Sequence, residues 1–283
     1  MALGKIRIGS MEVSRLAIGG NPFSGFSHQG DARDLSMRQY YTTARIKAAL
    51  RKAEAAGINT FFGRIDNHVV RLLQEYWDEG GKIQWMAQTA SEQADYIRNI
   101  KQAAAVGAKG IYVHGGVTDV WYYNKDLSHF QKALDEVRSH GLAAGLAGHR
   151  CELHDWINQN IKTDFHMCCY YDPSPRTSRP DHVVMDEENW SPKDRDDMTR
   201  TIQTLKAPAI HYKVLAGGHN PVVPALEYAA SKFRPQDVML IGFHLGDDED
   251  IIAKTVDLFE KIVEKKGTAA KGKADYPGIS PAM

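Results

Sequence analysis

Cysteine, long apolar runs and excess charge are all scarce in this chain of 283 residues. Its three cysteines, Cys151, Cys168 and Cys169, offer no disulfide framework, which is typical of a protein kept in a reducing compartment. The 35 basic and 35 acidic side chains balance, and no basic stripe with interleaved aromatic residues predicts a nucleic-acid surface. No stretch approaches the roughly 18 consecutive apolar residues of a membrane span, and residues 1–20 lack the apolar run of a signal peptide. We therefore expect a cytoplasmic protein that acts on a small molecule, with no nucleic-acid or membrane partner.

The chain does have a repeated alternation of short apolar runs and amphipathic helical stretches. Such alternation is typical of parallel strands, and eight repeats predict barrel closure. A hairpin at 5–13, turning at Gly9 and Ser10, precedes the first repeat. We predict an α/β protein with a single (β/α)8 TIM barrel spanning 1–283. The expected strands are 14–21, 59–63, 83–89, 110–116, 142–148, 165–172, 209–218 and 237–246, and the expected helices are 43–57, 68–80, 91–107, 127–141, 151–160, 197–206, 221–233 and 248–267.

Two segments fall outside this alternation. Residues 173–197 are polar and rich in proline and charge, which predicts a long loop at the barrel mouth with a functional role, such as covering the site. Residues 267–283 are rich in alanine, glycine and lysine, which predicts a flexible tail.

Histidines stand at several expected strand ends, where a βα barrel keeps its chemistry. His114 ends the fourth expected strand, His149 follows the fifth and His244 lies near the end of the eighth. With Glu152, three residues after His149, they form a three-histidine, one-carboxylate set that suits Zn, Mn or Fe(II). The alternatives are an acid/base role or a hydrogen-bonded buried imidazole for His114, and a carboxylate favoured by a helix N-terminus for Glu152.

Lys213 alternates with His211 on the seventh expected strand, so both side chains are expected to face the same way. A lysine inside the barrel would stabilise negative charge or form a Schiff base; the alternative places it at the rim with its ammonium group in water. The neighbouring Cys168 and Cys169 must face opposite sides of their strand, and we expect small buried apolar roles for them rather than nucleophilic ones.

Polar side chains surround the expected mouth at the ends of the first three strands. We predict that Asn21, Arg64, Asn67 and Gln88 bind a hydroxylated or carboxylated small substrate. Trp121, after the fourth strand, is predicted either to stack on a sugar-like substrate or to pack its own loop.

Four segments in the same order and spacing make the chain resemble the aldo-keto reductase superfamily over nearly its whole length. They are VSRLAIGGNPF at 13–23, GINTFF at 57–62, YKVLAGG at 212–218 and DVMLIGF at 237–243. The resemblance implies that the hairpin plugs the barrel. It also implies that Tyr212 stacks on a nicotinamide ring, and that Gly217 and Gly218 let the backbone approach an NAD(P) cofactor closely.

The resemblance fails at the catalytic residues. The family uses an aspartate, a tyrosine, a lysine and a histidine; here Gly63 replaces the aspartate, the tyrosine position falls at 66–68 with no tyrosine, and Gln88 replaces the lysine. Only the histidine remains, as His114. A phenol activated by lysine is therefore missing, and the family mechanism cannot be transferred.

The expected cofactor-phosphate end is acidic. The family's NADP-binding forms carry a basic residue there, whereas residues 247–250 read Asp-Asp-Glu-Asp and would repel a phosphate in direct contact. The same acidic run also suits a helix N-terminus.

Three functional hypotheses remain. The first is a non-redox lyase, hydrolase or isomerase for a small polar carbonyl or sugar-like substrate, with a divalent metal or acid/base assistance from His114 and Lys213. The second is a divergent NAD(P)-dependent oxidoreductase that uses another proton donor, for which we name Tyr171. The third is a non-catalytic barrel that binds a nucleotide.

Overall fold

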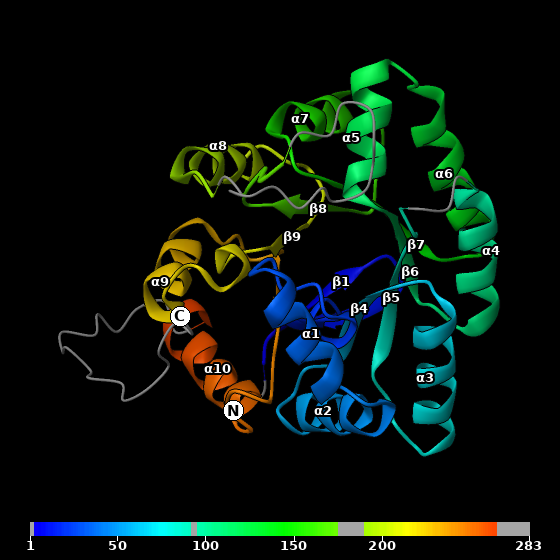
Figure 1. The fold of residues 1–283 in the computed structure, drawn as a ribbon. Helices are drawn as coiled ribbons and strands as arrows, with labels where there is room; N and C mark the ends of the chain where they lie inside the picture. Colours follow the sequence, from blue (N-terminus) through cyan, green and yellow to red (C-terminus); the bar gives the residue numbers. More distant parts are fainter. Residues whose placement is uncertain (1–2, 92–94, 175–189, 265–283) are drawn as a thin grey trace.

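Eight parallel strands close into a barrel in the computed structural model, which describes residues 3–91, 95–174 and 190–264. The last strand pairs with the first, so that Met239 lies opposite Leu16 and Gly242 opposite Gly19. Figure 1 shows the helices arranged as a ring around these strands. The predicted (β/α)8 fold class is thereby confirmed. In order around the barrel, the strands are β10 (Val238–Gly242), β3 (Leu16–Gly19), β4 (Thr60–Arg64), β5 (Gln84–Gln88), β6 (Gly110–Val113), β7 (Ala143–Gly148), β8 (Phe165–Cys169) and β9 (Ala209–Tyr212).

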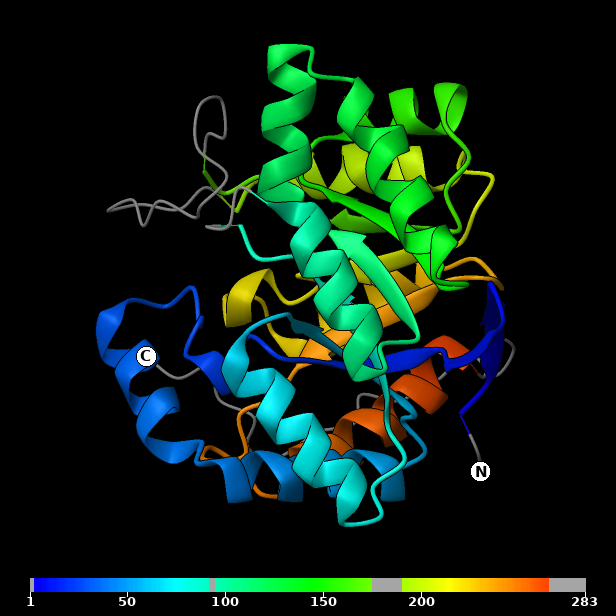
Figure 2. The same ribbon diagram turned by 90° about the vertical axis from the view of Figure 1, so that its right-hand side faces the viewer.

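The predicted N-terminal hairpin is present and packs into one end of the barrel. Strands β1 (Lys5–Ile8) and β2 (Met11–Ser14) pair antiparallel around a turn in which Gly9 has a φ of +58°. Three hairpin side chains, Ile8, Met11 and Val13, belong to the same buried cluster as the lumen-facing residues of the barrel strands. In Figure 2 the hairpin and helix α1 lie at opposite ends of the barrel. The carboxyl ends of the strands therefore form the mouth at the other end.

The helices pack their apolar faces on the outside of the barrel, and side-chain caps define where several begin. Thr42 accepts a hydrogen bond from the Arg45 N–H, and Asp66 accepts one from the Val69 N–H, which satisfies donors that the first helical turn leaves unpaired. No helix in the described ranges combines the length and the hydrophobicity of a membrane crossing. The helices are α1 (Asp31–Tyr40), α2 (Thr43–Ala55), α3 (Asn67–Asp78), α4 (Tyr96–Val106), α5 (Gly115–Asn124), α6 (Ser128–Ser139), α7 (Cys151–Asn160), α8 (Pro192–Ile202), α9 (Val222–Lys232) and α10 (Ile251–Phe259).

Two helices, α1 and α5, were not predicted. The first lies in the polar segment after β3, and its sequence, DARDLSMRQY, has only one buried residue, Met37, so it carries little apolar periodicity. The second follows β6 directly, because the His114 ring nitrogen Nδ1 accepts a hydrogen bond from the Gly116 N–H at 3.1 Å and caps the new helix. Residues 115–124 therefore form a helix where the sequence predicted a loop.

Two predicted boundaries also differ. Helix α8 begins at Pro192, inside the segment predicted as a loop, because Ser191 caps it and proline suits the first helical turn. Helix α4 begins at Tyr96, after its Asp95 cap, rather than at the predicted residue 91. Residues 175–189 of the predicted loop, and the whole predicted tail at 267–283, lie outside the described residues.

Candidate functional site

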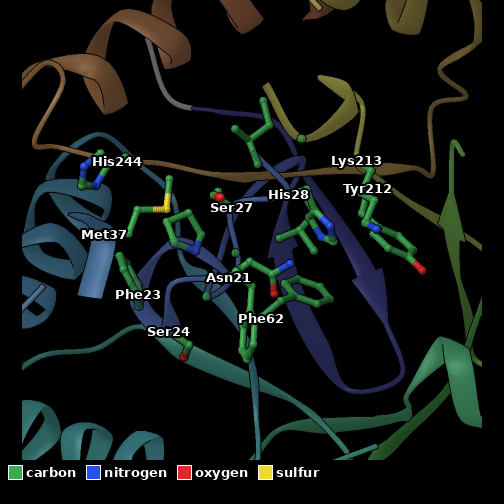
Figure 3. A pocket seen from close by; sticks show the side chains of 18 of the residues that line it. Asn21, Phe23, Ser24, Ser27, His28, Met37, Phe62, Tyr212, Lys213 and His244 are labelled. Atoms are coloured by element: carbon green, nitrogen blue, oxygen red, sulfur yellow. The ribbon is translucent and has the colours of Figure 1, made fainter. Parts of the chain in front are cut away.

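A cavity of about 600 Å³ opens at the barrel mouth, over the carboxyl ends of β3, β4, β9 and β10. Several residues predicted to bind substrate or cofactor contribute to its wall: Asn21, Arg64, Gln88, Tyr212, Lys213, Gly217, Gly218 and His244. Figure 3 shows Tyr212 and His244 at opposite ends of the cavity, with Asn21 and Phe62 between them. The cavity is thus elongated, with an inner end at the barrel centre and an outer end near the start of α10.

The inner end combines an apolar floor with polar walls. Phe62, Tyr112 and Met167 point into the lumen, and complete burial raises the pKa of the Tyr112 phenol, which keeps it protonated. Arg64 and Gln88, at the ends of β4 and β5, line the cavity above this floor. The Arg64 guanidinium is held 3.3 Å from an Asp66 carboxylate oxygen, so a positive charge is fixed at the rim of the inner end.

His68 also lines the cavity, and the sequence had marked it only as part of the 66–68 stretch that replaces the family's tyrosine. It lies in the first turn of α3, which Asp66 caps, and its side chain is exposed. An imidazole here shares the cavity wall with Arg64 and Gln88. Such a group can donate or accept a proton near neutral pH.

Lys213 does not follow the alternation predicted for it. Strand β9 ends at Tyr212, and Lys213 has a φ of +56°, so the period-two pattern stops one residue before the lysine. His211 is completely buried and hydrogen-bonds Tyr170 and Asp237, whereas Lys213 lines the cavity and its ammonium group lies 5.4 Å from the centre of the Trp190 ring. The two side chains therefore do not share a face, and only Lys213 can reach a ligand.

Residues 26–33, which we call the strap, cross over the loops that follow β9 and β10. Gln29 donates a hydrogen bond to the Gly217 carbonyl oxygen at 2.6 Å, and the His28 carbonyl oxygen accepts one from the His219 ring at 3.0 Å. At its end, Arg33 binds both carboxylate oxygens of Asp247. The strap and the loops that it contacts line the same cavity, so the strap covers the outer part of it.

The four predicted metal ligands are not brought together. His114 caps α5 through Nδ1, while His149 hydrogen-bonds Asp119 at 2.7 Å. Glu152 is exposed in the first turn of α7, beside the half-buried Cys151 thiol. His244 lies at the outer end of the cavity against the rings of Tyr40 and Tyr41. Within the described ranges no three His, Cys, Asp or Glu side chains form a metal-binding group, so the predicted ligand set is wrong.

His149 instead forms a buried pair with Asp119, a residue that the sequence gave no reason to select. Asp119 accepts hydrogen bonds from both the Nδ1 and the backbone N–H of His149. Asp119 lies on the unpredicted helix α5, thirty residues before its partner, so no local motif marks the pair. The His149 ring packs edge-on against Tyr212, with 6.1 Å between ring centres. The pair thus supports the side of Tyr212 that faces β7.

Gly115 permits this packing, and its replacement by alanine tests it. A Cβ at Gly115 would lie 2.9 Å from His149 Cε1 and 3.3 Å from the Tyr212 hydroxyl. We expect Gly115→Ala to lower the free energy of unfolding by about 1–3 kcal/mol through overpacking, measured by urea denaturation. The loss should shrink when Gly115→Ala is introduced into His149→Ala; equal losses in both backgrounds would contradict the proposed clash.

Three other predicted site residues lie away from the described wall of the cavity. Trp121 is buried between helices, where its ring stacks on His129 at 5.0 Å, so it packs its own segment and offers no face to a substrate. Asn67 is exposed at the start of α3. The Tyr171 hydroxyl accepts a hydrogen bond from Asn220 at 2.8 Å, and burial raises its pKa, which disfavours the role of proton donor named for it.

Comparison with known proteins extends the resemblance to the three-dimensional fold. The sequence matches no protein-family model and none of the curated proteins. Among solved structures, a Pseudomonas aeruginosa protein assigned to the aldo-keto reductases is 16% identical, with a TM-score of 0.59 over 90% of this chain and 96% of that chain. An aldo-keto reductase from Bacillus halodurans, in its holo form, is 12% identical, with a TM-score of 0.54 over 91% of each chain. The chain has an aldo-keto-reductase-like barrel.

This likeness is one of fold alone. The 3-deoxy-D-arabino-heptulosonate 7-phosphate synthase of Thermotoga maritima is also similar, at 13% identity and a TM-score of 0.51 over 93% of this chain and 90% of that chain. Because barrels of this kind serve unrelated reactions, the function must be argued from the cavity itself.

Proposed function

We propose that the chain is a nicotinamide-dinucleotide-dependent oxidoreductase acting on a small polar carbonyl compound or the corresponding alcohol. The observation that carries the proposal is the extent of the cavity, which runs from Tyr212 at the inner end to His244 at the outer end, along the ends of β9 and β10. An extended ligand with a reactive head suits such a cavity better than a compact one. The family resemblance implies a dinucleotide along the same two strands, which agrees with this proposal.

The residues along the channel fit that ligand. Gly217 and Gly218 line the cavity and have φ values of +64° and +96°, which glycine adopts without strain. Side chains at these positions would meet His28 and Gln29, so the glycines let the strap pack closely against the channel. The Tyr212 ring lines the inner end and offers an aromatic face. His244 lines the outer end, and burial lowers the pKa of its imidazole, which favours the neutral form.

The inner end supplies the remaining chemistry. A bound nicotinamide would supply or accept a hydride at the substrate carbon. His68, which lines this end, would give a proton to the carbonyl oxygen or take it back in the reverse direction. Arg64 and Gln88 would hold the polar groups of the substrate and stabilise negative charge on that oxygen.

The other two hypotheses have less support. Of the residues named for the non-redox hypothesis, Lys213 and His244 line the cavity, whereas His114, His149 and Glu152 are not among its lining residues. A purely nucleotide-binding barrel leaves the inner group of Arg64, His68 and Gln88 without a role.

Nucleotide binding is the direct test. Trp190 contacts Lys213 and lies against Gly217, so NADH or NADPH in the cavity should quench its fluorescence in a saturable way. We expect Tyr212→Ala to weaken that binding about tenfold, because an aromatic contact is worth about 1.4 kcal/mol. The control is Tyr123→Ala, whose ring is 53% exposed on α5 and should leave binding unchanged. The absence of saturable quenching by both nucleotides would refute the proposal.

A further inference from the structure

A row of three polar side chains lines the cavity at its inner end. Arg64 on β4 lies opposite Gln88 on β5 in the strand register, and Gln88 lies opposite Tyr112 on β6. Residues in register on neighbouring strands project from the same face of a sheet. Two positions before the row, Phe62 and Met86 belong to the buried cluster of the lumen, as Tyr112 does. Because interior positions recur at every second residue of a barrel strand, the whole row faces the lumen.

Tyr112 brings to this row a hydroxyl that no described residue uses. The residue is 3% exposed, and burial alone raises the pKa of its phenol, so the hydroxyl stays protonated and no hydrogen bond contributes. Its oxygen is not one of the enclosed, unpartnered polar atoms of the described residues, so it can be reached from the cavity. A buried polar group normally has a partner, and here a ligand atom in the cavity would be that partner.

Gln88 adds a second polar group beside this hydroxyl. Its backbone carbonyl oxygen accepts a hydrogen bond from the Ile65 N–H, whereas no hydrogen bond within the described residues engages its side-chain amide. The side chain is half-buried and lines the cavity. Two neighbouring strands thus present polar side chains to the same part of the cavity, above the apolar floor.

The charge at this end indicates which ligand the row suits. Arg64 adds a guanidinium, which is held between Asp66, 3.3 Å from its Nε, and the Phe26 ring, whose centre lies 5.9 Å away. Asp66 itself is not part of the described cavity wall, and Lys213, beside Tyr212, is a second cation of the inner end. The carboxylates in that described wall, at 247–248, belong to the outer end. A ligand group at the row therefore meets hydrogen-bond donors and positive charge.

From this row, and resting on the proposed function, we infer that the inner end binds a carboxylate of the substrate, so that the enzyme interconverts small oxo acids and hydroxy acids. Arg64 supplies a charged donor, and Gln88 and Tyr112 supply neutral ones, which matches the acceptor-only oxygens of a carboxylate. In the reaction the oxo carbon accepts a hydride, its oxygen accepts a proton and becomes a hydroxyl, and the nicotinamide cofactor is oxidised. The carboxylate is unchanged, and His68 on the same wall is left to act on the oxo group.

The experiment compares pyruvate with pyruvamide, which has the same shape but carries an amide in place of the carboxylate. Calorimetric titration of the protein saturated with the oxidised form of whichever nucleotide binds measures affinity without turnover, because neither compound can then be reduced. We expect pyruvate to bind at least about tenfold more tightly, since hydrogen bonds to a charged acceptor are the stronger ones. Arg64→Gln should bring the two affinities close to each other. Arg71→Gln, the same change at an exposed position of α3, should preserve the difference.

Tyr112→Phe is the independent variant, since phenylalanine keeps the buried ring and removes only the hydroxyl. It should weaken pyruvate binding about tenfold. Thermal stability should not fall, because the hydroxyl has no partner among the described residues that its removal would leave unpaired. Tyr123→Phe makes the same change on an exposed ring and should alter neither quantity.

The outcomes separate this inference from the proposed function. Pyruvamide binding as tightly as pyruvate, or the binding of neither compound to the nucleotide complex, would overturn the inference and leave the proposed function intact. A preference for pyruvate that persists in both Arg64→Gln and Tyr112→Phe would also overturn it, because the carboxylate would then lie elsewhere. Failure of both nucleotides to bind would overturn the proposed function, and the inference with it.

Discussion

Replacing Asp237 with alanine should lower the free energy of unfolding by about 3–5 kcal/mol, because the substitution leaves buried partners unpaired. Asp237 is completely buried just before β10. Its carboxylate accepts hydrogen bonds from the Ala209 N–H at 2.9 Å, from His211 at 3.1 Å and from Arg234 at 2.8 Å. Without this carboxylate, the Arg234 charge, the Ala209 N–H and the His211 ring nitrogen are left without their partner between the barrel and the helices.

Urea denaturation of the variant measures this loss, with Asp257→Ala as the control. Asp257 pairs with Lys261 on the exposed face of α10, and such surface pairs contribute about 0–1 kcal/mol. Similar losses in the two variants would show that the buried network contributes no more than a surface ion pair.

The same network predicts a loss of stability in acid. Burial alone would raise the Asp237 pKa, but hydrogen bonds from His211 and Arg234 outweigh it and lower the pKa from 3.8 to about 2. A carboxylate with a lowered pKa contributes stability that is fully present above its unfolded pKa and is lost as the pH falls through its folded pKa. The Asp237 contribution should therefore be intact above about pH 4 and disappear towards pH 2.

On the proposed function, replacing His68 with alanine should lower kcat by about 10²- to 10⁴-fold, because the proposed reaction would lose its general acid. NADH affinity should stay within about twofold, since the imidazole acts on the substrate rather than on the dinucleotide. Steady-state reduction of a small aldehyde such as glyceraldehyde, together with the fluorescence titration, separates the two effects.

Two further variants sharpen this prediction. His68→Tyr keeps a proton donor at the same position of α3 and should recover part of the lost rate. His140→Ala removes an exposed imidazole that only approaches Glu136 at 3.3 Å, and it should leave kcat unchanged. A kcat in His68→Ala close to that of the unaltered protein would assign the proton transfer to another residue.

The barrel could be predicted from the sequence because the pattern of apolar residues marks each strand and helix locally. Short apolar runs such as LAIG, and helical spacing in stretches such as HVVRLLQEYW, are local properties, and a closed set of eight repeats leaves few topologies. Gln88 was predicted from its place at a strand end, and Tyr212 from the family resemblance. Helix α1 was missed because it buries too little apolar surface to show a period.

The arrangement of the site residues was harder to predict than the fold, because it depends on which strand ends meet across the mouth. His149 and His244 both follow strands, yet one turns towards Asp119 on α5 and the other towards Tyr40 at the end of α1, and both of these helices were unpredicted. Lys213 was placed wrongly because one residue with positive φ ended the strand pattern. His68 was overlooked as an acid because a histidine stood where only a tyrosine was sought.

The strap has a consequence for the rate at which a bound ligand leaves the cavity. The strap is held by the hydrogen bond between Gln29 and Gly217 and by the ion pair between Arg33 and Asp247. On the proposed function, a dinucleotide beneath the strap would leave only after the strap opens, so this opening would govern its residence time. Added salt should then shorten that residence time by weakening the exposed ion pair.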